Sequence, residues 1–113
     1  MSPGYPAQRS LSWGRRQHIV YGEDDDVNKG GHMHGLGRPD KTEFPPGWDE
    51  DRIVDEVLSV ANRPDNVRPL PRNRWEAIGV GDGVIIKVVL NDSGQILAAW
   101  PLDGPGVRRN PRR

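Results

Sequence analysis

Residues 84–90 read Val-Ile-Ile-Lys-Val-Val-Leu, and this stretch decides the fold of a chain of 113 residues. Successive side chains of a β-strand point to opposite faces of the sheet, so every second residue of the run shares a face. We expect one face to be buried and lined by four aliphatic side chains: Val84, Ile86, Val88 and Leu90. On the other face, Lys87 stands between two further aliphatic residues. The stretch therefore predicts the most buried strand of a sheet.

Turn signals bound this strand on both sides. Gly81-Asp82-Gly83 precedes it and is typical of a tight hairpin turn. Asn91–Gly94 follows it and predicts a second turn. Apolar residues continue beyond both turns, so we expect neighbouring strands at Trp75–Val80 and Gln95–Trp100, the latter stopped by Pro101. Three such strands form an antiparallel meander.

The clearest helix precedes these strands, at Trp48–Asn62. Its apolar residues recur at helical spacing and form one face: Ile53, Val54, Val57, Leu58 and Ala61. Acidic residues occupy 49–51, in the first turn, where the helix dipole favours negative charge. Residues 66–72 contain two prolines and are expected to form a loop. A small antiparallel β-sheet meander packed against one main amphipathic helix is an α+β domain.

A chain of this length has room for one domain with one core. We expect residues 1–14 to be a flexible lead-in, residues 15–104 to be the folded domain and residues 105–113 to be a mobile basic tail. His18–Tyr21 is apolar enough to pack onto the core, and Lys41–Phe44 alternates polar with apolar residues as a short strand does.

Composition excludes several classes of protein. Cysteine is absent, so neither a disulfide framework nor a cysteine-based zinc site can form. No apolar run approaches the roughly 20 residues that a membrane span needs, and residues 1–17 lack the apolar core of a signal peptide. We therefore expect no membrane partner.

The charges cancel overall but are unevenly distributed. Residues 1–56 carry 7 basic and 11 acidic side chains, a net charge of −4, whereas residues 57–113 carry 9 basic and 5 acidic side chains, a net charge of +4. A net charge of zero argues against a tight non-specific nucleic-acid binder, whose affinity would come from phosphate contacts. A locally basic groove stays compatible with transient RNA binding.

All three histidines, His18, His32 and His34, fall within 17 residues, and Lys41 follows them. Histidine alone titrates near neutral pH without perturbation, so two imidazoles can share a proton-transfer reaction. A nearby ammonium can stabilise negative charge that builds up on a phosphate. The set therefore fits metal-independent cleavage of RNA, with Gly30-Gly31 giving the backbone the freedom to place His32 tightly.

Two alternatives from other classes remain open at this stage. His32 and His34, together with the acidic run at Asp24–Asp26, could hold a divalent metal ion in an interaction module. The chain could also bind RNA without cleaving it. A chelator would abolish the metal-dependent behaviour, and a search for cyclic-phosphate ends on treated RNA would separate cleavage from simple binding.

The order and spacing of several segments resemble a bacterial EndoU-type endoribonuclease domain. These segments are His18–Gly22, Gly30–His32, Lys41–Pro45, the amphipathic helix and Gly94–Pro101. The resemblance covers roughly residues 15–104 and implies an EndoU/barnase-like ribonuclease architecture. Such domains are similar in fold and active site to the uridylate-specific endoribonuclease of coronaviruses. They commonly form the C-terminal part of polymorphic or contact-dependent growth inhibition toxins.

The resemblance implies that two histidines and a lysine carry catalysis. They map onto His18, His32 and Lys41, with His34 as a rival for the second histidine. Lys87 is the other lysine that could face the site. One imidazole would take the proton of a ribose 2′-hydroxyl and the other would protonate the leaving 5′-oxygen, while the ammonium stabilises the charged phosphorane. We assign His32 as the base and His18 as the acid.

The family also carries a threonine or serine and, two residues later on the last strand, an aromatic residue that together hold uridine. Here these positions are Ala98 and Trp100, so the aromatic surface is kept and the hydroxyl is missing. This departure puts uridine selectivity in question. His34, Thr42 and Arg74 complete the set of residues that we expect to contact substrate.

The resemblance also implies partners and a setting. The substrate would be RNA, with tRNA among the candidates, and the products would carry 2′,3′-cyclic phosphate and 5′-hydroxyl ends. No cofactor is expected, although stimulation by manganese or magnesium is left open. A parent toxin polypeptide would lie upstream, a cognate immunity protein would block the site, and the domain would be secreted or delivered from a cell surface to act in the cytoplasm of a target cell.

Overall fold

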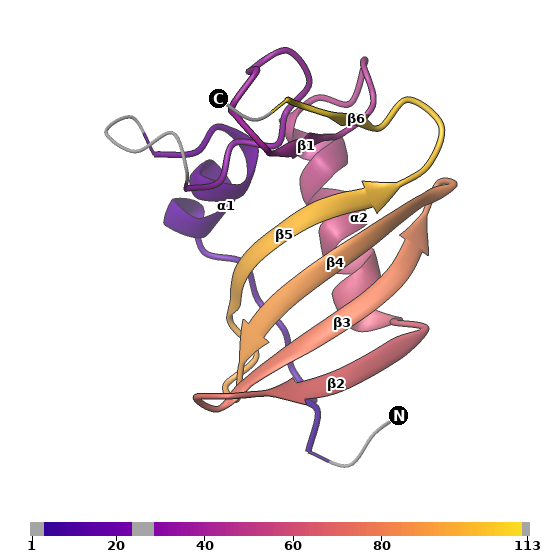
Figure 1. Cartoon of the computed structure of the whole chain (residues 1–113). Helices are drawn as coiled ribbons and strands as arrows, with labels where there is room; N and C mark the ends of the chain where they lie inside the picture. Colours follow the sequence, from indigo (N-terminus) through magenta and orange to yellow (C-terminus); the bar gives the residue numbers. More distant parts are fainter. Residues whose placement is uncertain (1–3, 24–28, 112–113) are drawn as a thin grey trace.

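The computed structural model describes residues 4–23 and 29–111 (Figure 1). Its centre is a four-stranded antiparallel sheet whose strands lie side by side in chain order. The strands are β2 (Asn66–Leu70), β3 (Arg74–Gly81), β4 (Val84–Asn91) and β5 (Ile96–Asp103). The α+β class and the antiparallel meander expected from the sequence are confirmed.

Strand β4 lies in the interior of the sheet, between β3 and β5. The four aliphatic residues predicted to line its inner face are each at most 1% exposed. The connection to β3 consists of Asp82 and Gly83, whose φ angles of 48° and 82° are both positive. Two central residues with positive φ define the type I′ turn that matches the twist of paired strands, which explains the Asp-Gly pair.

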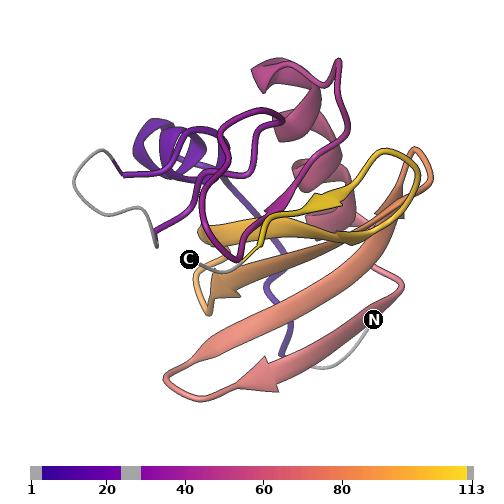
Figure 2. The same cartoon turned by 45° about the horizontal axis from the view of Figure 1, so that its top comes forward.

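Helix α2 (Glu50–Asn62) lies across the inner face of the sheet and packs on β3 and β4 (Figure 2). One side of the helix is buried there, through Ile53, Val54, Val57, Val60 and Ala61. The helix begins two residues later than predicted, because the Asp49 carboxylate accepts a hydrogen bond from the Arg52 amide and caps it. No described helix covers the opposite face of the sheet (Figures 1 and 2).

Two prolines lie inside strands, where the sequence had predicted a loop or a strand end. Residues 66–72 were expected to be a loop, but Pro69 is part of β2 and pairs opposite Trp75. Strand β5 was expected to stop at Pro101, but it continues to Asp103. Both strands are edges of the sheet, where a residue without an N–H group costs no ladder hydrogen bond on its open side.

Within the N-terminal segment, which the sequence predicts to be a flexible lead-in, Tyr5 and Ser10 contact the rest of the fold. The ring of Tyr5 is only 5% exposed, and its hydroxyl donates a hydrogen bond to the carbonyl of Ala61 at 2.7 Å. The amide of Ser10 donates to the carbonyl of Gly94 at 2.9 Å. The buried aromatic ring therefore fastens this segment to the end of α2.

Helix α1 (Trp13–Val20) follows directly and packs against β5. Its side chains Ile19 and Val20 are buried, which confirms the expected packing of this apolar stretch. The helix ends at Val20 with Tyr21 as its C-cap, and the following Gly22 has a φ of 81°, the left-handed conformation typical of the residue after a helix cap. Within the described residues, neither helix is long and apolar enough to span a bilayer.

A second, two-stranded sheet joins distant parts of the chain. Strand β1 (Thr42–Glu43) pairs with β6 (Arg108–Arg109), and the following Asn110 is 3% exposed. These residues of the expected mobile tail are therefore part of the fold. The small sheet lies next to β5, close to the loop that follows α1 (Figure 1).

Candidate active site

The last turn of α1 and the loop after it form one hydrogen-bonded unit. A helix leaves its last carbonyl groups without partners inside the helix. Here the amides of Gly31, His32 and Met33 donate to the carbonyls of residues 18, 19 and 20 at 3.0–3.1 Å. The loop thereby completes the helix end, and His18 and His32 are held in a fixed relation to each other.

Gly30 is required by this close approach. Its φ is +70°, and a β-carbon at this position would lie 2.1 Å from the carbonyl oxygen of His18. Any other residue would push the loop off the helix. The expectation that the glycine pair serves to place His32 is confirmed at this position.

Two adjoining hollows beside this unit share three residues: His32, Lys41 and Trp100. The first hollow is further lined by His18, Ile19, Lys29, Gly30, Ala98 and Ala99, and the second by Asp40, Thr42 and Arg109. Their volumes are about 240 and 180 Å³, so each is smaller than the roughly 300–1,000 Å³ of pockets that enclose drug-sized ligands. The structure therefore brings both predicted catalytic histidines and the predicted lysine to one cleft.

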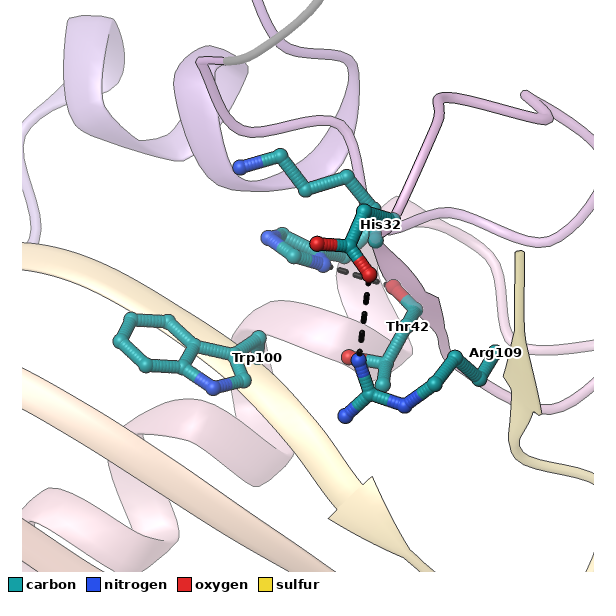
Figure 3. Close-up of a pocket in the computed structure, with 6 residues that line it drawn as sticks. His32, Thr42, Trp100 and Arg109 are labelled. Carbon is teal, nitrogen blue, oxygen red and sulfur yellow. Dashed lines mark hydrogen bonds and ion pairs between the residues drawn. The ribbon is translucent and has the colours of Figure 1, made fainter. Parts of the chain in front are cut away.

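His32 is held in a single tautomer. Its Nδ1 lies 2.7 Å from the backbone carbonyl oxygen of Thr42, and a carbonyl only accepts, so Nδ1 carries the proton. The neutral ring consequently has a free lone pair on Nε2. Figure 3 shows the second ring nitrogen of His32 on the side away from Thr42.

Burial keeps the ring of His32 neutral. With 6% of the residue exposed, desolvation lowers the pKa of His32 from 6.5 to about 4. The positive charges of Lys41 and His18 act in the same direction, whereas the bond to the Thr42 carbonyl opposes them. At neutral pH His32 is therefore an imidazole with an available acceptor, as a general base must be.

His18 is oriented by a different partner. Its Nδ1 lies 3.0 Å from the carboxylate of Glu23, so that nitrogen carries a proton and points away from the reactive position. When the second nitrogen is also protonated, the ring forms an ion pair with Glu23. The ring of His32 is thus oriented by a neutral carbonyl and the ring of His18 by a carboxylate.

The two lysines named from the sequence occupy different positions. Lys41 lines both hollows next to His32. Lys87, on β4, lies 3.0 Å from the carboxylate of Glu76 and 5.5 Å from the ring centre of Trp100. Lys87 is therefore engaged in an ion pair on the open face of the sheet, and Lys41 is the better placed of the two.

Trp100 forms the floor of the cleft. Its ring stacks beside that of His32, with 6.3 Å between ring centres and 24° between planes (Figure 3). The residue is half-buried, so part of the indole is accessible from the cleft. Ala98 lines the same hollow without offering a hydroxyl. Thr42, whose hydroxyl is buried without a hydrogen-bond partner among the described residues, lies on the opposite wall.

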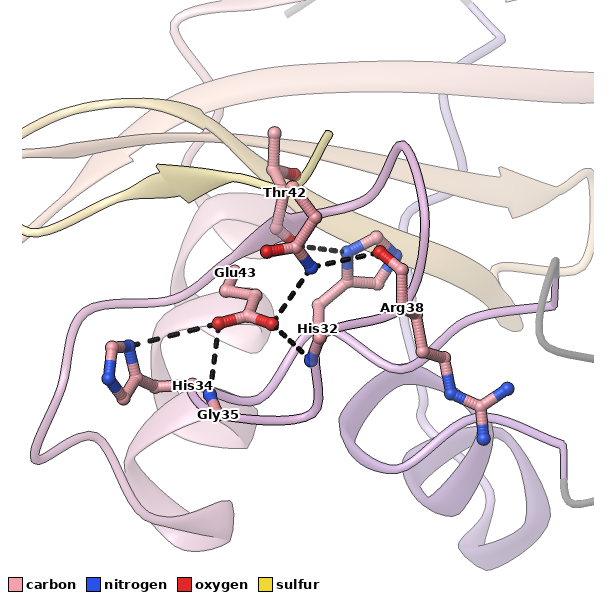
Figure 4. A network of polar contacts seen from close by, with 8 residues as sticks. His32, His34, Gly35, Arg38, Thr42 and Glu43 are labelled. Carbon is pink, nitrogen blue, oxygen red and sulfur yellow. Dashed lines mark hydrogen bonds and ion pairs between the residues drawn. The ribbon is translucent and has the colours of Figure 1, made fainter. Parts of the chain in front are cut away.

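Two residues expected to contact substrate are not brought to this cleft. His34 lies on the other side of the loop from His32 and approaches Glu43 at 3.9 Å (Figure 4). Arg74 is the first residue of β3 and lines neither hollow, and its Nε donates to the carbonyl of Pro71. His32 is buried and lines both hollows, whereas His34 is exposed and lines neither, which favours His32 over its rival.

Glu43 is a buried residue of the site region that sequence reasoning missed. Its carboxylate accepts hydrogen bonds from the amides of Gly35 at 2.9 Å and Gly37 at 2.7 Å, and from the side chain of Asn110 at 2.9 Å (Figure 4). Burial alone would raise the pKa of Glu43, but these bonds and the charge of nearby His34 outweigh it, so the pKa lies below its usual value. The only signal was an acidic residue in a short strand beside a glycine-rich loop.

The metal-binding alternative finds no support among residues 4–23 and 29–111. No group of three or more histidine, aspartate or glutamate side chains there is arranged to hold a metal ion. Asp24–Asp26, which that hypothesis needs, lies outside the described residues. His32 and His34 themselves diverge, as noted above.

A small α+β domain whose cleft combines two imidazoles, an ammonium and a partly exposed indole has side chains suited to a nuclease. The family model for the bacterial EndoU nuclease matches residues 16–103. The chain belongs to this family and is a nuclease domain at that level. No curated protein and no solved structure matches it significantly.

Proposed function

We propose that the domain is a metal-independent endoribonuclease that cleaves RNA by attack of a ribose 2′-hydroxyl on the adjacent phosphate. The observation that carries this proposal is the bond from His32 Nδ1 to the Thr42 carbonyl. It leaves Nε2 as the acceptor in a cleft that His18 and Lys41 also line. A base, an acid and a cation around one cleft are what this reaction requires.

In the proposed reaction, His32 Nε2 takes the 2′-hydroxyl proton while the 2′-oxygen forms a bond to phosphorus. The bond from phosphorus to the 5′-oxygen breaks, and protonated His18 donates its proton to that oxygen. Lys41 stabilises the negative charge of the phosphorane. The products carry a 2′,3′-cyclic phosphate and a 5′-hydroxyl, and neither oxidant nor cofactor is needed.

Trp100 supports a base-binding role in this proposal. Its open face offers a stacking platform, and stacking on an aromatic ring contributes about 1–3 kcal/mol per base. Because Ala98 lacks the family hydroxyl, we propose that cleavage near uridine is a preference rather than a strict requirement.

Mapping the ends of cleaved RNA tests the function directly. Wild-type protein should generate 2′,3′-cyclic phosphate and 5′-hydroxyl ends, with cleavage undiminished in excess EDTA. His18→Ala should generate almost none. Products with 5′-phosphate and 3′-hydroxyl ends, or cleavage that stops in EDTA, would contradict the mechanism. Binding of intact RNA without any new ends would favour a non-catalytic RNA-binding domain.

The setting implied by the family is also part of the proposal. We propose that the domain is the toxic part of a larger secreted polypeptide, that tRNA is among its targets, and that an immunity protein covers the cleft in the producing cell. Growth arrest of bacteria that express the wild type, but not His32→Ala, would support this. Harmless high-level expression of active wild type would contradict it.

The two lysines can be separated by substitution. Lys41→Ala should lower kcat by about 10²–10³-fold, the effect of removing one group that stabilises transition-state charge. Lys87→Ala should lower kcat by less than about tenfold, since Lys87 is paired with Glu76. Single-turnover cleavage of a short RNA measures both, with thermal unfolding as a check on folding. A larger loss in Lys87→Ala would transfer the role to that residue.

A further inference from the structure

Strand β6 carries Arg109 to the cleft from outside the part of the chain that the family model matches. The matched residues end at 103, yet Arg109 pairs directly with Thr42. Beyond this pair, the amide of Asn110 donates to the carbonyl of Lys41 at 2.8 Å, and the amide of Asp40 donates to the carbonyl of Pro111 at 3.1 Å. The backbone that bears Arg109 is therefore firmly attached to the loop that bears Lys41.

The side chain of Arg109 lines the second hollow with His32, Lys41 and Trp100 (Figure 3). The Arg109 side chain is 65% exposed. Its Nη1 lies 3.9 Å from the Asp40 carboxylate, which is also exposed, so this ion pair is long. Exposed ion pairs of this kind contribute little free energy. A phosphate, which accepts two parallel N–H bonds from a guanidinium, is a stronger partner and can displace such a contact.

We propose that Arg109 binds the phosphate next to the scissile one in an RNA strand. This inference rests on the proposed function, which places the scissile phosphate in the first hollow, between His18, His32 and Lys41. His18 lines only the first hollow and Arg109 only the second, with His32, Lys41 and Trp100 between them. A nucleotide chain that crosses the shared residues presents its scissile phosphate to one hollow and the neighbouring phosphate to the other.

The test compares substrates that differ by a single phosphate. A dinucleoside monophosphate contains only the scissile phosphate, and two derivatives add one terminal phosphate, at the 5′ end or at the 3′ end. Wild-type kcat/KM should be about 10–100-fold higher for one derivative than for the parent compound, the effect of charge-assisted hydrogen bonds. Arg109→Ala should remove this advantage through KM, and it should lower kcat/KM much more for that derivative than for the parent compound. Arg109→Lys should restore part of it.

Arg108 supplies a matched control on the same strand. Adjacent residues of a strand point to opposite sides, and Arg108 is likewise exposed, so Arg108→Ala removes the same charge from the other side of β6. It should leave the advantage of the added phosphate intact. If Arg108→Ala removes the advantage of the added phosphate as fully as Arg109→Ala does, Arg109 contributes only general charge attraction. If Arg109→Ala lowers kcat/KM by the same factor for all three substrates, Arg109 contacts the scissile phosphate. Either result would overturn the proposal, as would no loss at all.

Binding of uncleavable 2′-deoxy analogues separates this inference from the proposed function. The analogue with the added phosphate should bind wild type more tightly than the parent analogue does, and Arg109→Ala should abolish the difference. If RNA is not cleaved but the difference in binding persists, the endoribonuclease proposal fails and the phosphate subsite stands. If RNA is cleaved and the difference is absent, the subsite fails alone.

Discussion

Replacement of His32 by asparagine is expected to lower kcat/KM for RNA by about 10²–10⁴-fold, the contribution of a positioned general base. Asparagine is the informative substitution because its side-chain N–H can take the place of Nδ1–H and donate to the Thr42 carbonyl. Only the acceptor at Nε2 is then lost. His32→Ala should lose the same activity but also stability, since the carbonyl is left without its partner.

Steady-state cleavage of a short RNA, combined with thermal unfolding of each variant, checks this result. His32→Asn should unfold within a few degrees of wild type. His34→Asn is the matched control, because His34 is exposed and directed to the other side of the loop, and it should retain nearly full activity. Full activity in His32→Asn would remove His32 from the mechanism, and inactivation by His34→Asn would restore its rival.

The pH dependence of cleavage follows from the same group. A general base must be unprotonated, so kcat/KM should fall as acid protonates His32. Because the pKa of His32 is lowered to about 4, the acid limb of the profile should lie near pH 4 rather than near the unperturbed value of about 6.5. An acid limb near pH 6.5 in the pH–rate profile would contradict the assignment of this buried ring as the base.

Stability should respond to pH in the same window. Between about pH 6.5 and 4 the unfolded state binds a proton at His32 and the folded state does not, so the folded state loses stability as the pH falls through this interval. His32→Asn lacks the group and should lose less over that range. The difference between the two unfolding curves isolates the histidine from the other titrating side chains.

Local sequence signals predicted the centre of the fold because its strand and turn are determined by residues that are neighbours in the sequence. Alternation in 84–90 and the Asp82-Gly83 turn determine a strand and its hairpin with no knowledge of the rest of the chain. Pro69 and Pro101 misled the prediction because a proline is acceptable in an edge strand and harmful in an interior one. Which strands form the edges is a property of the assembled sheet.

The residues of the candidate site likewise fall into those that the sequence predicted and those that it did not. The resemblance pointed to His18, His32 and Lys41, and the structure brings them to one cleft, although their catalytic roles stay a prediction. Glu43 and Arg109 escaped notice because their partners are remote in sequence: Glu43 and Asn110 are 67 residues apart. No periodicity or local motif reports such a contact.

Glu43→Ala is expected to destabilise the fold by about 3 kcal/mol or more. The carboxylate is fully buried and accepts three hydrogen bonds, one of them from the buried side chain of Asn110; a buried donor left unsatisfied costs about 1–3 kcal/mol, and the loss of the two amide bonds and of the buried side-chain volume adds to this. That is a large share of the roughly 5–15 kcal/mol that stabilises a typical domain. Urea unfolding measures the loss. Asp55→Ala, an exposed carboxylate on α2, should change stability by no more than about 0.5 kcal/mol.

Activity should fall together with stability in the Glu43 variants, because the neighbours of this residue hold His32. The carbonyl of Thr42 accepts from the His32 ring, and the amide of Phe44 donates to the His32 carbonyl at 2.7 Å. Cleavage measured well below the unfolding temperature should therefore drop in kcat. Normal kcat in a folded Glu43→Ala protein would show that the carboxylate supports the fold alone.

Glu43→Gln separates the charge of this residue from its shape. The amide can still accept from the backbone but brings its own N–H group to a site that already holds three donors, so the loss of stability should be smaller than in Glu43→Ala.

The pKa of Glu43 is lowered in the folded state. The contribution of its charge to stability is therefore present above the unfolded pKa of about 4.3 and disappears as the pH falls through the folded pKa. Wild type should accordingly lose more stability than Glu43→Gln on acidification below about pH 4.3. Parallel curves for the two proteins would show that Glu43 is already protonated in the fold, and the network of Figure 4 would then rest on a neutral acid.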